Sequence, residues 1–235
     1  MKALTLTQPH ARLVALGVKP FETRSWATAF RGLLVIHAAR ATPSELNGIT
    51  VPTPDGGCCL AGPFNHYLPA DLEAYWREMP HSAIEALVVV ENCRPGPQAR
   101  MGLLSAATRA EPGYHPKLLG QALTGRDFQA VALDAAEFGD FRPGSWAWSL
   151  DLVMDMEGLI PRLVAGHQGL WNLPPRVEYD VLAAYTRAKG GMICKVCGCT
   201  DNRPGLKPLG PGGWAEDYLC SECHTDAPAY TGRGK

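Results

Sequence analysis

The strongest constraint on the fold is an alternation of large apolar and small or polar side chains over residues 145–152. Successive side chains of a β-strand point to opposite faces, so this period of two predicts a strand with one core face and one small, polar face. The large side chains of this strand are Trp146, Trp148, Leu150 and Leu152. The chain therefore contains at least one amphipathic strand that packs on an apolar layer.

Other runs of strand length add to this sheet. Leucines alternating with threonines predict a short strand over residues 2–6. Continuous apolar runs over residues 31–37 and 84–90 predict strands that are buried on both faces. Residues 129–133 also have strand character. We therefore expect a sheet of several short strands.

Helices are expected in three places. Residues 9–17 predict a short helix, because their proline suits a first helical turn and their final glycine suits a left-handed end. Apolar side chains at helical spacing predict helices over 70–79 and 177–189. Segments 41–69 and 94–127 are rich in Pro and Gly without periodicity, and we expect loop insertions there.

The overall charge excludes a protein that coats nucleic acid through a broad positive field. The chain has 235 residues and a formal net charge of -1, whereas such coating needs many Lys and Arg contacts to phosphates. The first 40 residues are different, because their only acid is Glu22 while the bases are Lys2, Arg12, Lys19, Arg24, Arg31 and Arg40. A local site for an anionic ligand is therefore expected near the N-terminus.

The location of the protein is predicted from its first segment and its cysteines. Polar residues interrupt the first 18 residues, so they lack the apolar core of a signal peptide, and no later run has the length of a membrane span. Five of the eight cysteines crowd into residues 194–223, which favours metal binding in a reducing compartment over disulfides. We expect a cytoplasmic protein without membrane contact.

The segment from Gly17 to Trp26 is the main candidate for a ligand site. If the chain is extended after its proline, Glu22, Arg24 and Trp26 project to one face. Lys19 precedes the proline, where the chain is kept out of helix, so its ammonium can lie beside the Glu22 carboxylate. An amine, a carboxylate, a guanidinium and an indole then converge.

Several interpretations of this segment remain open. In a binding site, Lys19 and Arg24 hold phosphates or base acceptors, Glu22 accepts from a base amino group, and Trp26 stacks on a base. In an enzyme, Lys19 is a general base and Glu22 a proton shuttle or charge stabiliser. Alternatively, the charges form a surface salt-bridge cluster and Trp26 belongs to the core.

Several motifs along residues 1–174 together resemble the ASCH domain family, which has a PUA-like fold. The matching pieces are Gln8-Pro9, the motif Gly17-x-Lys19-x-x-Glu22-x-Arg24 with Trp26, the strand from Arg31-Gly32 to His37-Ala38-Ala39, EFGDF at 137–141, Pro143 to Trp148, and Gly166 to Trp171. The resemblance implies a small β-barrel with flanking helices and a motif-lined cleft that binds RNA or modified nucleotides. Some relatives are hydrolases of acetylated cytidine or ribonucleases.

The resemblance also bears on individual residues. It places His167 and Gln168 on a turn near the cleft. His37, at the end of an apolar strand, either faces the cleft or has a structural role. Three positions depart from the family pattern. His10 stands where relatives often carry Trp, Ser145 stands where an Arg is common, and Glu22 replaces the threonine that acts in the acetylcytidine hydrolases. The ligand specificity of this protein therefore need not follow that of its relatives. The replacement of the catalytic threonine by Glu22 also argues against acetylcytidine hydrolysis.

The C-terminal cysteines predict a zinc site. Two C-x-x-C pairs are separated by a Gly- and Pro-rich loop, a spacing by which four thiolates reach one tetrahedral zinc ion. The expected ligands are Cys194, Cys197, Cys220 and Cys223, with Cys199 and His224 as spare candidates. The segment also resembles a small zinc ribbon of phage-type proteins.

The sequence therefore predicts an α+β protein with two units. Residues 1–174 form the PUA-like barrel, residues 175–191 a linker helix, residues 192–226 the zinc ribbon and residues 227–235 a flexible tail. Residues 192–235, the ribbon together with the tail, balance five bases against five acids, so we expect the ribbon to be structural or to dock a protein partner, with Trp214 and Tyr218 as contacts. The predicted functions are RNA or modified-nucleotide binding, alternatively a hydrolase, alternatively an interaction scaffold.

Overall fold

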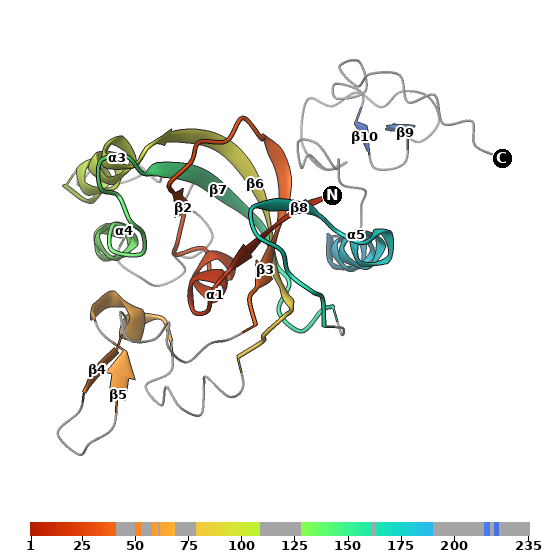
Figure 1. Cartoon of the computed structure of the whole chain (residues 1–235), viewed down its shortest axis with the longest axis horizontal. Helices are drawn as coiled ribbons and strands as arrows, with labels where there is room; N and C mark the ends of the chain where they lie inside the picture. The colour runs from red at the N-terminus through yellow and green to blue at the C-terminus, as the bar shows by residue number, and fades with distance from the viewer. Residues whose placement is uncertain are drawn as a thin grey trace.

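A curved six-stranded sheet organises the α+β fold (Figure 1). The structure is a computed structural model that describes residues 1–40, 50–52, 58–60, 62–68, 79–108, 128–160, 163–189, 214–216 and 219–220. The strand order is β2-β7-β6-β3-β1-β8, in which β1 and β3 are parallel and the other neighbours antiparallel. The strands are β1 (Lys2–Leu6), β2 (Phe21–Arg24), β3 (Gly32–Ala38), β6 (Ile84–Pro95), β7 (Trp146–Asp155) and β8 (Leu170–Asn172).

Four of the strand predictions are confirmed with small shifts of their ends. The predicted strands over 2–6 and 31–37 are β1 and β3, while 84–90 is the first part of the longer β6. The alternating segment 145–152 is β7, but its predicted small, polar face is not open to solvent. Ala147 and Ser149 on that face are as buried as Trp148. Helices that the sequence did not predict cover Ala147 there.

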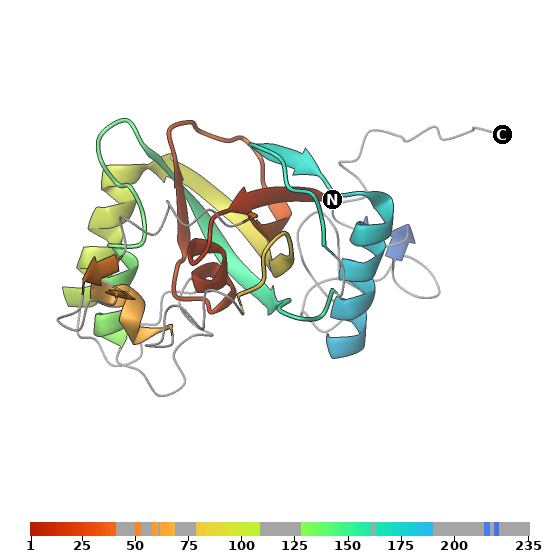
Figure 2. The ribbon, with the colours of Figure 1, turned by 60° about the horizontal axis from the view of Figure 1, so that its bottom comes forward.

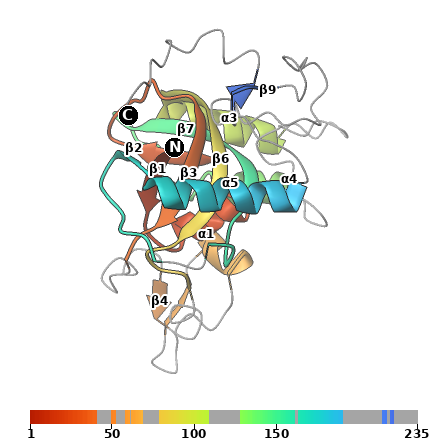
Figure 3. The ribbon, with the colours of Figure 1, turned by 90° about the vertical axis from the view of Figure 1, so that its right-hand side faces the viewer.

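The helices lie on both faces and at one end of the sheet. The sheet curves around α1 (His10–Ala15), and α5 (Pro175–Lys189) crosses the opposite face (Figures 1 and 3). The helices α3 (Gly96–Thr108) and α4 (Phe128–Ala135) pack together at the end of the sheet away from α5 (Figure 2). A short 3-10 helix, η2 (Gly62–His66), contributes Phe64 to the core beside α1.

The alternation of side chains along each strand determines which helix a side chain contacts. In β3, Leu34 and Ile36 share a core cluster with α1, whereas Leu33 and Val35 share one with α5. Since alternate residues face opposite sides, a strand between two helices must be apolar at every position. This explains the continuous apolar run of β3.

Two predictions about the middle of the chain are wrong. Residues 129–133 belong to α4 rather than to a strand, because a short apolar run does not itself distinguish a strand from a buried helix. Residues 94–108 are not a loop, since β6 continues to Pro95 and α3 follows at once. The Gly96-Pro97 pair begins α3, because proline is tolerated in a first helical turn. The helix predicted at 70–79 lies almost wholly outside the described residues.

Two small strand pairs complete the described part. The antiparallel pair β4 (Thr50–Pro52) and β5 (Cys58–Leu60) lies within the segment that we expected to be irregular. The pair β9 (Trp214–Glu216) and β10 (Leu219–Cys220) lies in the predicted ribbon. The predicted helix over 177–189 is confirmed as α5, which begins at Pro175. None of the helices in the described ranges combines the length and apolar character that crossing a membrane requires.

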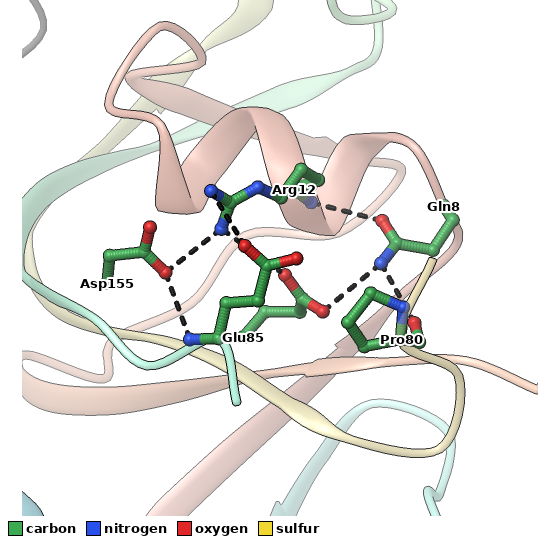
Figure 4. Close-up of polar contacts among 6 residues, drawn as sticks. Gln8, Arg12, Pro80, Glu85 and Asp155 are labelled. Atoms are coloured by element: carbon green, nitrogen blue, oxygen red, sulfur yellow. Dashed lines mark hydrogen bonds and ion pairs between the residues drawn. The ribbon is translucent and has the colours of Figure 1, made fainter. Parts of the chain in front are cut away.

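A polar network fastens the start of α1 to the sheet (Figure 4). The side-chain amide of Gln8 donates to the Pro80 carbonyl at 3.0 Å and to Glu85 Oε1 at 3.3 Å. Its oxygen accepts a hydrogen bond from the backbone N–H of Arg12 at 3.1 Å. The Arg12 guanidinium lies 2.9 Å from Asp155 Oδ1 and 3.9 Å from Glu85 Oε2. The network therefore joins α1 to both β6 and β7.

Glu85 is the unusual member of this network, because it is a fully buried carboxyl group on β6. Burial raises its pKa to about 7, although the nearby charge of Arg12 opposes the shift. In the unfolded chain the same group titrates near 4.5. Between these values the folded protein holds a proton that the unfolded chain has lost, so stability falls as pH rises.

We predict that Glu85→Gln removes this pH dependence. The variant should be more stable than the wild type by up to roughly 3 kcal/mol above about pH 7, and nearly equal to it below about pH 4.5. Urea denaturation at several pH values measures this difference. Glu91→Gln is the matched control, because Glu91 is exposed on the same strand and its removal should leave the pH profile unchanged. A wild-type stability that does not fall across this window would contradict the prediction.

Candidate ligand-binding site

The Lys19 ammonium is buried and its hydrogen bonds are already used within the protein. The chain leaves α1 through Gly17, whose φ of 73° is left-handed, and then turns Lys19 inward. Its ammonium donates to the carbonyls of Phe21 at 2.9 Å and Phe138 at 2.7 Å. The carboxylate of Glu22 lies 3.2 Å away. Since an ammonium has three N–H bonds, these partners leave none for a ligand.

Glu22 connects the two cations of the motif. Its Oε2 faces Lys19, and its Oε1 lies 2.9 Å from Arg24 Nε. Burial lowers the pKa of Lys19, and the charge of Glu22 opposes this effect. The structure rules out a surface ion cluster beside a core tryptophan, because Lys19 is 3% exposed and Glu22 7%, whereas Trp26 is 38% exposed.

Arg24 connects one edge strand of the curved sheet to the strand next to the other edge. It lies in β2, one edge of the strand order, and donates from Nη2 to the Thr5 carbonyl of β1 at 3.1 Å. The opposite edge strand, β8, pairs with β1 only over Lys2–Leu4, so this contact lies just beyond the end of that pairing. With Glu22 on one side and Thr5 on the other, the guanidinium is held in place.

Three cavities meet at Arg24, and two of them divide the predicted site residues. The first, which we call the acceptor cavity, measures about 430 Å³ and is lined by Lys19, Glu22 and Arg24, together with Thr5, His10, Glu137 and Asp140 among others. The second, which we call the cationic cavity, measures about 710 Å³ and is lined by Arg24, Trp26, His37 and Gln168, together with Thr5, Arg40 and His167 among others. Among the described residues, Arg24 and Thr5 alone line both of these cavities. The remaining cavity measures about 580 Å³ and is lined by Thr23, Asp140 and Arg142 among others.

The cationic cavity combines basic groups with an exposed aromatic ring. Among the described residues that line it, Arg24 and Arg40 carry positive charge and there is no carboxylate. Trp26 packs edge-on against Trp148, with ring centroids 4.7 Å apart, so its indole is fixed at the cavity wall. The exposed side chain of Gln168 adds an amide to the rim. This lining suits a ligand with an anionic and a flat aromatic part.

His37 lines the cationic cavity and is almost fully buried. Its Nε2 lies 2.8 Å from the Val164 carbonyl, and its ring packs edge-on against Trp171. A Cβ on Gly166 would lie only 2.5 Å from the His37 ring, so the glycine allows this close packing. Burial lowers the pKa of His37, which keeps the imidazole neutral at physiological pH. These contacts favour a structural role.

His10 contributes a neutral imidazole to the acceptor cavity. Burial, assisted by the charge of Lys19, lowers the pKa of His10 to about 3. Its ring packs edge-on against Phe64 with centroids 5.8 Å apart, and its Nδ1 has no hydrogen-bond partner. Such an unpaired buried atom costs stability unless a ligand or water satisfies it. His10 thus lines the cavity while one of its ring nitrogens is unsatisfied.

Two acids on the turn after α4 complete the acceptor cavity. Glu137 pairs with Arg100 at 2.9 Å, and Asp140 pairs with Arg142 at 2.7 Å. Hydrogen bonds from Arg142 lower the pKa of Asp140 to about 2, so this carboxylate is ionised at neutral pH. The sequence motif that contains both acids was noted only as part of the family resemblance. Thr5, which lines both cavities, and Arg40, which lines the cationic cavity, were also missed as site residues, because residues far apart in sequence form these walls only in three dimensions.

The predicted zinc ligands cannot be compared with the structure. Cys194, Cys197 and Cys223 lie outside the described residues, and only the backbone of Cys220, in β10, falls within them. The spare candidates Cys199 and His224 are outside them too. Within the described ranges, no three His, Cys, Asp or Glu side chains are grouped to hold a metal ion.

Comparison with known proteins adds no identification. No family model matches the chain, and no curated protein matches it significantly. The two cavities at Arg24 are therefore the main evidence for a function.

We predict that Lys19→Met destabilises the fold by about 3 kcal/mol, because it leaves Glu22 buried with one partner fewer and two carbonyls unsatisfied. Urea denaturation measures the change. Arg142→Ala is the control, since its ion pair with Asp140 is fully exposed and should not shift the unfolding midpoint. Equal midpoints for Lys19→Met and wild type would show that the buried cluster does not stabilise the fold.

Proposed function

We propose that the protein binds RNA or a modified nucleotide in the cationic cavity, as an ASCH domain of PUA-like fold. The observation that carries the proposal is the pairing of Arg24 and Arg40 with the indole of Trp26 in one cavity whose described lining has no carboxylate. The order of the sequence motifs and the curved sheet closed by Arg24 support the assignment to this fold.

The chemistry of each wall matches one part of a nucleotide. The guanidinium groups of Arg24 and Arg40 bind phosphate oxygens, and the exposed face of Trp26 stacks on a base. Arg24 is already oriented by Glu22 and Thr5, so little side-chain entropy is lost when it binds a phosphate. Gln168 at the rim is able to hydrogen-bond the sugar or base.

A binding function is favoured over the alternative of a hydrolase. As a general base, Lys19 would have to lose its proton, and Glu22 would then lose its buried counterion. The three acceptors around the ammonium occupy its N–H bonds, and the charge of Glu22 opposes the lowering of the Lys19 pKa by burial. Lys19 and Glu22 are therefore assigned to positioning Arg24, rather than to catalysis.

We also propose that residues 192–226 form a zinc ribbon that docks a protein partner. The donor set supports this proposal, because four thiolates in two C-x-x-C pairs match a closed structural zinc site. Cys194, Cys197, Cys220 and Cys223 would hold the ion, which would supply folding energy rather than chemistry. Trp214 and Tyr218 are the proposed contacts with a partner.

The nucleotide proposal predicts measurable binding of adenosine 5′-monophosphate by calorimetry at low salt. Trp26→Ala should weaken binding by about tenfold through lost stacking, and Arg40→Ala should weaken it and reduce its salt dependence. Tyr179→Ala and Arg176→Ala are matched controls, because both residues are exposed on α5 outside the two cavities. Absence of binding by nucleotides and by single-stranded RNA would refute the proposal, as would equal affinities for all four variants.

The ribbon proposal predicts one zinc ion per chain. Elemental analysis of the purified protein should find this ratio, and Cys220→Ser should lose the metal because three thiolates bind zinc more weakly than four. Cys93→Ser is the control, since this cysteine lies in β6 and should have no effect on metal content. A Cys220→Ser protein that retains its full zinc content would overturn the ligand assignment.

A further inference from the structure

We infer that the acceptor cavity is a second nucleotide subsite, which receives the neighbouring base of a single RNA strand and selects bases that carry an amino group. The inference rests on the proposed function, because it places the first nucleotide in the cationic cavity. It adds a minimum ligand length of two nucleotides and a sequence preference at one of them.

The first argument is the position of Arg24 between the two cavities. Its guanidinium lines both of them and is fixed there by Glu22 and the Thr5 carbonyl. An anion bound to Arg24 can therefore carry one substituent in each cavity. In a single RNA strand, the phosphodiester is the anion that carries a nucleoside on each side. One nucleoside then lies against Trp26, and the next enters the acceptor cavity.

The second argument is the size of the two spaces. The cavities measure about 710 Å³ and about 430 Å³, and each falls within the range of small-ligand pockets. Since Arg24 and Thr5 are their shared wall, a mononucleotide that is stacked on Trp26 leaves the acceptor cavity vacant. A dinucleotide makes contacts in both.

The third argument is the hydrogen-bonding character of the acceptor cavity. Lys19 lines it but directs its N–H bonds to protein acceptors. Three acidic residues, Glu22, Glu137 and Asp140, also line it. Each carboxylate has about four lone-pair positions, so the observed ion pairs leave some of them for a ligand. The cavity therefore offers more acceptors than donors.

His10 is independent evidence that the cavity is built for a polar ligand. Its Nδ1 is buried at the cavity wall without a partner, and the imidazole is neutral because burial lowers its pKa. A charged histidine would have cancelled the negative character of the wall. The neutral ring instead leaves an unsatisfied hydrogen-bonding atom in a residue that lines the same cavity as the three acids.

The residues that line the acceptor cavity distinguish the bases by the hydrogen-bonding groups on each base edge. Adenine, cytosine and guanine carry an exocyclic amino group, which donates hydrogen bonds to carboxylates. Uracil presents a carbonyl oxygen at the corresponding position, where it would face carboxylate oxygens without a donor between them. The acceptor cavity should therefore favour an amino-bearing base over uracil.

The test is calorimetric titration of the full-length protein with adenosine 5′-monophosphate and with the set of ribodinucleoside monophosphates. We expect the best dinucleotides to bind at least about fivefold more tightly than the mononucleotide. At one of the two positions, replacing an amino-bearing base by uracil should weaken binding by about fivefold or more. Deoxyribonucleotide counterparts that bind more tightly would overturn the assignment to RNA.

Two variants connect the preference to the acceptor cavity. His10→Phe keeps a ring against Phe64 but removes the unpaired Nδ1, and Asp140→Asn replaces an exposed carboxylate by an amide. Both should reduce the discrimination against uracil, whereas Glu91→Gln, an exposed change outside both cavities, should retain it. Circular dichroism melting verifies that each variant is folded.

The outcomes separate this inference from the proposed function. If the mononucleotide binds as tightly as every dinucleotide, the second subsite is refuted while the first stands. If dinucleotides bind more tightly without a base preference, or if folded His10→Phe and Asp140→Asn keep the full preference, the acceptor assignment is overturned. If neither mononucleotide nor dinucleotide binds, the proposed function itself fails.

Discussion

The contact between Arg24 and the Thr5 carbonyl is the interaction on which the candidate site depends. It ties β2, at one edge of the curved sheet, to β1, whose pairing with the other edge strand has just ended. The guanidinium keeps this position because Glu22 holds its Nε, and Glu22 is in turn fixed by the buried Lys19. The two ion pairs of the motif therefore hold the Arg24 guanidinium between the acceptor cavity and the cationic cavity.

Burial changes what each charged residue can do. The sequence suggests Lys19 as a phosphate-binding group or a general base. In the structure its ammonium is buried and all its N–H bonds have acceptors within the protein. Arg24 is partly open and has donors left, so the binding role passes to it. A similar principle applies to the carboxyl of Glu85, where burial raises the pKa and makes stability depend on pH. Location, rather than residue type, decides the chemistry.

Much of the fold was predictable because its strands have strong local patterns. The alternation in β7 and the apolar run of β3 identify both strands, and the motif residues Lys19, Glu22 and Arg24 do lie together. The segment of α4 was misassigned because a short apolar run fits a strand as well as a helix, and its packing on α3 decides the outcome. Trp26 was expected beside the charges of Lys19 and Glu22, but its side chain lines the other cavity.

The sequence by itself determined that the chain has an α+β core and that a Lys-Glu-Arg cluster follows its first helix, because these features depend on local periodicity and spacing. Only the tertiary structure decided how the cluster is used. The curvature of the sheet brings Thr5 of β1 to Arg24 of β2. His10 of α1 lines one cavity with Lys19 and Glu22, whereas Trp26 lines the other. Such contacts depend on how distant strands close on one another, and no local pattern in the chain encodes that closure.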